Sequence, residues 1–216
     1  GGPIVDNYGR NRRFPAASMV TGLLGNALGL AHEDALILNE LQERLYFGSV
    51  IDRPGFLIED YQTVDFSQDF LNATGWTTHG YREDRESSVA KATHIRYRPY
   101  YADCCCTVLF TLQLPEKTPT LAEVEHFLDH PVRPLFIGRK SCVPSCIMKR
   151  KVLQANSLLA AIKHLYIGGK LLVQLPAEEA ANLDEEHLFS LFDCRDWLNQ
   201  IHSGERLVWE GEIDLG

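Results

Sequence analysis

The amino-acid sequence predicts an α+β protein, and three observations support this fold class. Apolar side chains occupy alternate positions from Cys104 to Leu114, which is the period of a strand with one buried face. Thr120 and Glu123 form a capping-box pattern that begins many helices. Residues 1–138 read as helix, strand, strand, excursion, strand, helix, strand. With one more strand at the start, this order approaches the β-α-β-β-α-β unit of ferredoxin-like and RRM-like folds.

The first predicted helix begins at Ser18, as its N-cap, and runs to about Ala31. Three glycines, at positions 22, 25 and 29, interrupt it. Each costs a helix about 1 kcal/mol relative to alanine. We therefore interpret these glycines as positions of close packing on one side of the helix. A second helix is expected at residues 34–45, with leucines on one stripe.

The rest of the chain alternates strands with helices. Residues 60–103 are too long for a routine connection, and we interpret them as a functional excursion or disorder. We divide the chain into a palm at 1–151, with an excursion at about 76–103, and a small acidic C-terminal α+β unit at 152–216. The elements expected beyond the second helix are strands at 46–51, 56–59 and 104–114, a helix from Thr120 to Pro131, a strand at 132–137, a helix at 157–167, a strand at 171–175, acidic helical turns and a strand at 206–213.

Composition and charge exclude several classes of protein. The 216 residues are 45% hydrophobic with a formal net charge of −8, which is typical of a globular protein and unlike collagen or a disordered chain. No apolar run approaches the roughly 18 residues of a membrane span, and no signal peptide is recognisable. We therefore expect a cytoplasmic protein that has no membrane partner. No Walker A, G-x-S-x-G or dinucleotide motif occurs.

Cysteine and histidine patterns give little indication of a metal. The consecutive residues Cys104, Cys105 and Cys106 fit reduced, partly buried thiols better than a disulfide framework. His126 and His130 share a helix face at i, i+4 and could bind a metal, but solvated or capping histidines are the more ordinary interpretation. No metal and no cofactor are expected.

One segment is basic although the chain as a whole is acidic. Residues 131–151 hold six arginines and lysines and no acidic residue. A local cationic stripe on an acidic body suits a protein that binds one polyanion at one place. A solvated basic face is the alternative interpretation.

Four motifs in register resemble the CasD family. Arg13-Phe14-Pro15, Ser18 and the Gly22-to-Gly25 stretch match its opening motif without a gap. Three further stretches agree in order: Asp60 to Val64, Tyr100 to Asp103, and Phe136 to Cys142. Together they run from about residue 12 to 146, whereas the C-terminal third matches only loosely. The CasD family is the RNA-handle-binding subunit of Cascade, the type I-E CRISPR surveillance complex.

The resemblance implies an RRM-like palm with a β-hairpin thumb and a further strand before Gly1. It implies a non-catalytic subunit in antiviral defence that grasps the repeat-derived 5′ handle of the CRISPR RNA (crRNA). The subunit would cap the backbone filament, contact the backbone and large subunits, and reach target DNA near its PAM-proximal end through the assembly.

The candidate RNA-binding residues follow from these motifs and from charge. A helix N-terminus offers N–H groups to phosphate, and arginine can hold a phosphate with two hydrogen bonds. Aromatic side chains interleaved with basic residues suit stacking on splayed nucleotides. Family members often carry a basic residue at position 16 or 17, where this chain has alanine, so no phosphate contact is expected from those side chains. The candidates are Arg10, Arg12, Arg13, Ser18, Tyr61, Arg82, Lys91, Arg96, Arg98, Gly138, Arg139, Lys140, Ser141 and Cys142.

Three alternatives stay open. The chain could be a metal-independent endoribonuclease that processes the repeat, because His79, Tyr81, Lys91 and His94 fall in the excursion. It could be a structural adaptor without RNA contact. At the level of single residues, Arg13 could pair with an acidic residue of the second helix.

Overall fold

The computed structural model describes residues 11–65, 75–76, 82–83, 93–145, 148, 151–181 and 183–216. These residues fall into two compact units. One unit comprises residues 11–56 and 103–216, and the other lies within residues 57–102. We describe each unit by itself.

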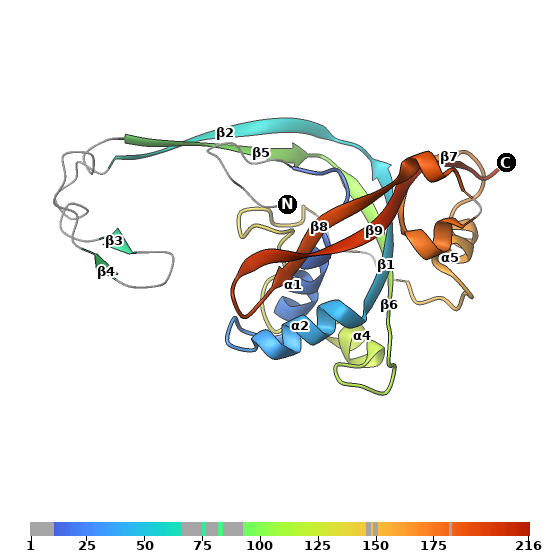
Figure 1. Ribbon diagram of the computed structural model, residues 1–216, viewed down its shortest axis with the longest axis horizontal. Coiled ribbons are helices and arrows are strands. Elements are labelled where there is room, and N and C mark those ends of the chain that lie inside the picture. Colours follow the sequence, from blue (N-terminus) through green and yellow to red (C-terminus); the bar gives the residue numbers. More distant parts are fainter. Residues whose placement is uncertain are drawn as a thin grey trace. The chain divides into compact units, whose positions relative to one another are not determined.

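The larger unit is built on a five-stranded antiparallel sheet with strand order β6-β1-β7-β9-β8 (Figure 1). The α+β class predicted from the sequence is therefore confirmed. Strand β7 pairs with β1, so residues after 151 add strands to the same sheet as residues 45–53. The strands are β1 (Leu45–Arg53), β6 (Cys105–Leu112), β7 (Lys170–Pro176), β8 (Leu188–Asp196) and β9 (Ile201–Asp214).

Apolar clusters cover both faces of this sheet. Val50 packs with Ile162 and Trp209 on one face, and Phe47 packs with Leu24 and Val124 on the other. Positions 47 and 50 of β1 point to opposite faces because side chains alternate along a strand. The helices are α1 (Ala17–Leu28), α2 (Ala35–Arg44) and α4 (Leu121–Asp129) on the Phe47 side, and α5 (Leu158–Leu165) on the Val50 side (Figure 1).

The alternation predicted for residues 104–114 is confirmed within β6. Val108, Phe110 and Leu112 pack in the cluster on the α1 side. The two end positions of the predicted strand, Cys104 and Leu114, lie outside β6 and are exposed. The intervening Leu109 joins the cluster on the α5 side, so this strand is apolar on both faces.

Two helix starts were correctly predicted. Thr120 Oγ1 accepts a hydrogen bond from the Glu123 N–H, and the Glu123 carboxylate accepts one from the Thr120 N–H, which forms the capping box of α4. Ser157 caps α5, since its hydroxyl accepts from the Ala160 N–H at 3.0 Å. Each of these caps joins residues three positions apart, so the start of each helix depends on local sequence.

The glycines of α1 are packing positions, as predicted. A Cβ atom on Gly25 would lie only 2.6 Å from Leu38 Cδ2, and one on Gly22 would lie 3.3 Å from the Trp197 ring. Gly29 has a left-handed φ of 81° and ends the helix at Leu28, three residues earlier than expected. This glycine is therefore a C-cap and not part of the helix.

Residues 132–137 were wrongly predicted to be a strand. They run beside the end of α1, where the Arg133 guanidinium donates to the carbonyl oxygens of Gly29 at 2.7 Å and Leu30 at 2.8 Å. The Val132 N–H donates to the Ala27 carbonyl, and the Asn26 amide donates to the Pro134 carbonyl. These bonds satisfy backbone groups left open at the helix terminus, which no strand pattern reveals.

The acidic helical turns expected near residues 177–187 are two short 3-10 helices, Ala177–Ala180 and Glu185–His187. The strand after them, β8, was missed. It lies at the edge of the sheet, and the Gln42 side chain of α2 bonds both backbone groups of Arg195 in β8, at 2.9 and 3.0 Å. Buried and exposed positions alternate only weakly along β8, so its sequence lacks a clear strand pattern. Contacts with distant residues define this strand instead.

The smaller unit contains a long two-stranded ribbon. Strand β2 (Phe56–Asp65) pairs with β5 (Thr93–Ala102), and the short β3 (Gly75–Trp76) pairs with β4 (Arg82–Glu83). The ribbon occupies the position in the chain where a thumb was expected. It begins near residue 57 and not near residue 76, because β2 is longer than the strand predicted at 56–59.

In the described part of the chain, no helix is long and apolar enough to cross a membrane.

The cysteines in the described part of the chain are free thiols, and burial raises the pKa of Cys106 to about 12. At pH 8 the Cys106 thiolate population is therefore about a thousandth of that of an ordinary thiol. We expect iodoacetamide to modify Cys106 at least 100-fold more slowly than exposed Cys104, as measured by peptide mass spectrometry. Equal rates at the two thiols would contradict this prediction.

Candidate nucleic-acid interface

The start of α1 is capped by a residue from a distant strand. Ala16, not Ser18, is the N-cap, and it has no side-chain bond to the helix. The carboxylate of Asp193, in β8, accepts from the Ala17 N–H at 3.0 Å. Ser18 lies one position inside the helix. One anion therefore already sits at this helix terminus, so phosphate binding here would depend mainly on neighbouring side chains.

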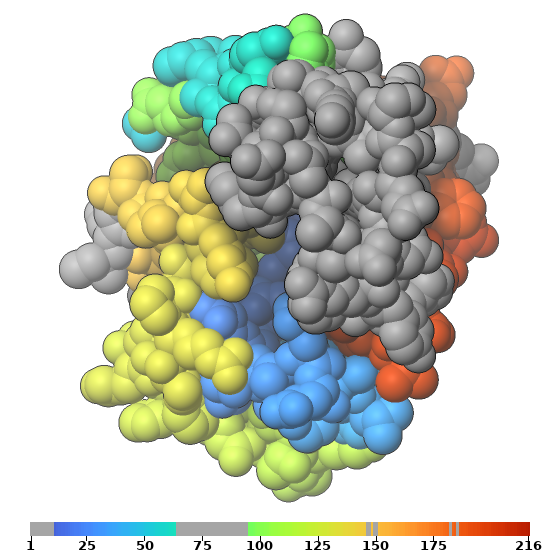
Figure 2. All heavy atoms as spheres, turned by 90° about the vertical axis from the view of Figure 1, so that its left-hand side faces the viewer, coloured from blue at the N-terminus to red at the C-terminus, as the bar shows by residue number. Residues whose placement is uncertain are grey.

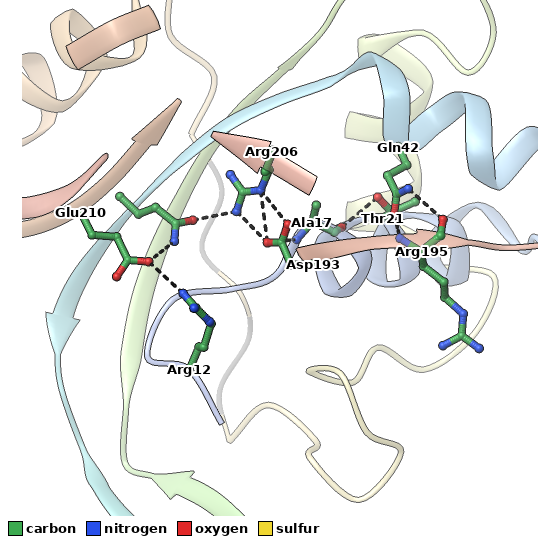
Figure 3. Close-up of polar contacts among 9 residues, drawn as sticks. Arg12, Ala17, Thr21, Gln42, Asp193, Arg195, Arg206 and Glu210 are labelled. Carbon is green, nitrogen blue, oxygen red and sulfur yellow. Dashed lines mark hydrogen bonds and ion pairs between the residues drawn. The ribbon is translucent and has the colours of Figure 1, made fainter. Parts of the chain in front are cut away.

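A chain of polar contacts leads from this cap to the surface (Figure 3). Asp193 holds the Arg206 guanidinium at 2.8 and 2.9 Å, and Arg206 donates to Gln174 at 2.8 Å. Gln174 donates to Glu210 at 2.6 Å, and the Glu210 carboxylate lies 3.6 Å from Arg12. Gln174 and Asp193 are almost completely buried. The network therefore links the cap of α1 to the Arg12 side chain at the surface.

Arg12 and Arg13 lie in the segment that enters α1. The Arg12 guanidinium is 5.5 Å from the ring centre of Phe189, and about half of its side chain is exposed. Arg13 is exposed as well, while the next residue, Phe14, is buried. The pairing of Arg13 with an acidic residue of the second helix is not found among the described contacts. Two guanidinium groups are thus presented beside the first turn of α1.

The basic loop, residues 138–142, packs against the same turn. Gly138 has a φ of 75°, and a Cβ atom there would lie 3.5 Å from Met19 Cγ. The loop is closed by bonds from the Ile137 N–H to the Cys142 carbonyl and from the Cys142 N–H to the Arg139 carbonyl, both 2.8 Å. Figure 2 shows the segment after α4, in yellow, alongside α1, in blue.

This packing brings most of the palm candidates near one helix turn. Lys140 and Ser141 are exposed, and Arg139, Cys142 and Ser18 are half-buried. The segment before α1 contributes Arg12 and Arg13, and the turn itself contains Ser18. The loop after α4 contributes residues 138–142. Arg133, another basic residue of the 131–151 segment, binds backbone carbonyls instead.

The ribbon candidates belong to the smaller unit. Tyr61 is exposed and makes an edge-to-face contact with Tyr97, with ring centres 5.5 Å apart. Arg96 and Arg98 flank Tyr97 in β5 and therefore lie on the opposite face of the ribbon. The described part of the chain includes neither Arg10 nor Lys91, nor the side chain of Arg82. The same holds for His79, Tyr81 and the side chain of His94, on which the ribonuclease alternative depends.

The pair at i, i+4 on α4 forms no metal site with other described residues. The rings of His126 and His130 stack with centres 5.0 Å apart. Within the described ranges, no group of three or more histidine, cysteine, aspartate or glutamate side chains could hold a metal ion.

Sequence reasoning missed the residues that organise this interface. Asp193, Gln174, Arg206 and Glu210 come from three strands and meet only through strand register, in which Gln174 is opposite Glu210. The only sequence signal was the presence of polar residues inside apolar strands.

The fold is of the α+β class, and basic residues from two segments lie near the first turn of α1. Known proteins with similar sequences show the family to which this chain belongs. Residues 1–209 match the family model described as "CRISPR-associated protein (Cas_Cas5)". This chain belongs to that family of CRISPR-associated proteins.

Named relatives agree with this assignment. The chain is 31% identical over 144 residues to "CRISPR system Cascade subunit CasD" of Escherichia coli (strain K12). The match covers 66% of this chain and 60% of that relative, which is less than two thirds of the relative's length.

Two solved structures share the fold. A chain of a "CRISPR RNA-guided surveillance complex" superposes with a TM-score of 0.64 at 19% identity, covering 99% of this chain and 85% of the other. A "Crystal structure of Cas protein" superposes with a TM-score of 0.55 at 22% identity, covering 98% and 86%. At these identities the likeness concerns the fold.

Proposed function

We propose that this protein is a non-catalytic subunit of a type I-E CRISPR RNA-guided surveillance complex and that it binds the repeat-derived 5′ handle of the crRNA. The name of the Escherichia coli relative, a Cascade subunit, supports the assembly. The observation that carries the RNA-binding role is the packing of the basic loop, with Gly138 against Met19, beside Arg12 and Arg13.

The charge distribution suits such a role. The chain has a formal net charge of −8, so we do not expect it to bind nucleic acid nonspecifically. Its basic residues near the first turn of α1 form a local site for a few phosphates. On the ribbon, the Tyr61–Tyr97 pair and the arginines of β5 supply the aromatic and cationic groups on which unpaired bases stack.

The proposed role requires no covalent chemistry. Holding the handle would place this subunit at one end of the backbone filament, in contact with the backbone and large subunits. Target DNA near its PAM-proximal end would be reached through those neighbours. We further propose the cytoplasm as the site of action, since crRNA assemblies act on intracellular nucleic acid.

Replacing Arg139 and Lys140 together with alanine is expected to weaken handle retention at least tenfold at about 150 mM salt. Each lost phosphate contact should also lower the slope of log affinity against log salt by about 0.7. The measurement is filter binding of crRNA to the purified complex over a salt series. Thermal unfolding should be unchanged, because Lys140 is exposed and Arg139 only half-buried.

The matched control removes two positive charges elsewhere in the same unit, with Lys163→Ala and Lys170→Ala. Both lysines are exposed and belong to α5 and β7. If the control weakens retention as much as the loop variant does, the effect is one of net charge alone. If the loop variant holds the handle unchanged, the basic loop is only a solvated face.

A further inference from the structure

A cleft of about 400 Å³ lies beside the Arg12–Glu210 ion pair. We call it the Arg13 cleft. Its polar side chains carry both signs of charge, with Arg13 and Glu212 among them, and its apolar lining includes Phe14 and Leu172. The whole cleft lies in the larger unit. Its volume suits one nucleotide or a molecule of similar size.

Two of the charged groups in the cleft are already engaged. Arg12 faces Glu210 at 3.6 Å, and the Glu210 carboxylate also accepts from Gln174 at 2.6 Å. In contrast, no hydrogen bond or ion pair with another described residue engages Arg13 or Glu212, and both are exposed. Arg13 and Glu212 are therefore the cation and the anion that the cleft offers to a ligand.

The rest of the lining suits a flat, partly apolar group. Leu172 of β7 is opposite Glu212 of β9 in the strand register, so the carboxylate stands next to an apolar side chain on the same face of the sheet. His187 is exposed at the rim, with its ring edge-to-face to Trp209 at 5.8 Å. Imidazole rings are among the groups on which unpaired bases stack.

A ligand that matches this set of groups carries an anion, an aromatic plane and hydrogen-bond donors on the edge of that plane. A nucleotide has all three. Its phosphate would pair with the Arg13 guanidinium, and its base would lie over Leu172. Glu212 would accept hydrogen bonds from an amino group on the base edge, as carboxylates do from cytosine N4.

We propose that the Arg13 cleft binds one nucleotide of the RNA and that Glu212 selects a base with an exocyclic amino group. This inference rests on the proposed RNA-binding function and adds base selectivity to it. Guanine fits best, because its N1–H and its amino group present two adjacent donors to the two carboxylate oxygens. Uracil fits worst, because its single N3–H lies between two carbonyl oxygens that repel the carboxylate.

The test titrates the full-length protein with the 5′-monophosphates of guanosine, adenosine, cytidine and uridine. Binding is followed through the backbone amide signals of Gly211 and Leu172 in ¹H–¹⁵N spectra. We expect saturable shifts with the three amino-bearing nucleotides and at least fivefold weaker binding of uridine monophosphate. The Glu212→Gln substitution should reduce this difference to less than twofold, and Arg13→Gln should weaken all four by a similar factor.

The control is Glu205→Gln, which changes an exposed carboxylate on the same strand, β9, outside the cleft. It should leave the uridine difference intact. Equal binding of all four nucleotides by the wild-type protein, or a uridine difference that survives Glu212→Gln, would overturn the proposal. So would the absence of shifts at Gly211 and Leu172.

This experiment separates the cleft from the handle-binding role. The amide shifts of Gly211 and Leu172 and the Glu212→Gln variant report on the cleft, whereas the Arg139/Lys140 variant changes only the basic loop. Loss of handle retention in the Arg139/Lys140 variant, without nucleotide selectivity in the cleft, would overturn only the present inference. If the cleft selects nucleotides but the loop variant retains the handle as the wild type does, the proposed role of the loop is contradicted.

Discussion

Replacing Arg44 with alanine is expected to lower the free energy of unfolding by about 3–5 kcal/mol. The side chain is only 3% exposed, and its guanidinium lies 3.8 Å from the Glu40 carboxylate. It donates hydrogen bonds to five backbone carbonyls in the connection from β6 to α4, those of Gln113, Leu114, Thr118, Lys117 and Pro119, at distances from 2.6 to 3.2 Å.

The alanine variant would remove the donor from all five carbonyls at once, and a buried polar group that loses its partner is costly. The measurement is the denaturant midpoint followed by circular dichroism. Arg44→Lys should give an intermediate loss, because it keeps the charge but cannot reach all five acceptors.

Arg53→Ala provides the contrast. Arg53 also forms an ion pair, with Asp103 at 2.8 Å, but its side chain is 59% exposed. Exposed pairs contribute at most about 1 kcal/mol, so this variant should be nearly as stable as the wild type. Comparable losses at the two arginines would show that the carbonyl cluster around Arg44 does not carry the stability assigned to it.

Replacing Asp193 with alanine is expected to cost about 3–5 kcal/mol and to weaken RNA retention as well. The carboxylate is the acceptor for the first N–H of α1 and the partner of Arg206, whose guanidinium lies 4.4 Å from the centre of the Phe47 ring. Without Asp193, this largely buried cation has no carboxylate beside it. The start of α1 also loses its attachment to β8, and the contact between Met19 and the basic loop depends on that position.

A double-mutant cycle with Arg206→Ala tests the assignment. The two substitutions should be non-additive by about 1–3 kcal/mol, because they remove the same interaction. Asp196→Ala on the same strand is the control. Among the described residues, its carboxylate accepts hydrogen bonds only from Leu198 and Asn199 in its own turn, so a loss of about 1 kcal/mol is expected. Additive losses at Asp193 and Arg206 would refute the assigned pairing.

Features of the fold that depend on neighbours in sequence were predicted well. The capping box at Thr120 and Glu123, the start of the helix near residue 157 and the alternation through Val108 and Phe110 all arise within a few residues of chain. Gly22 and Gly25 were also interpreted correctly as packing positions, whereas Gly29 lies beyond the helix as its C-cap. The RNA-binding motifs around Arg13 and Arg139 stood out by residue type, although their contact with RNA stays a prediction.

The errors share a cause. Ser18 has the right chemistry for an N-cap, but Asp193 reaches the helix from 176 residues away and sets its start at Ala17. Residues 132–137 have the apolar composition of a strand, yet their backbone groups and Arg133 bind the end of α1. In each case a partner distant in sequence provides the hydrogen bonds, and no local pattern encodes it.

By itself, then, the sequence determined the α+β class, the cap of α4, the presence of α5, the buried face of β6 and the two basic segments, because each depends on short-range periodicity or on residue type. The tertiary structure alone decided that residues after 151 join the same sheet as β1, and that the basic loop meets the first turn of α1. It also decided that Arg13 and Glu212 share one cleft. These features arise from strand register and side-chain packing between distant segments, which become defined only when the whole chain has folded.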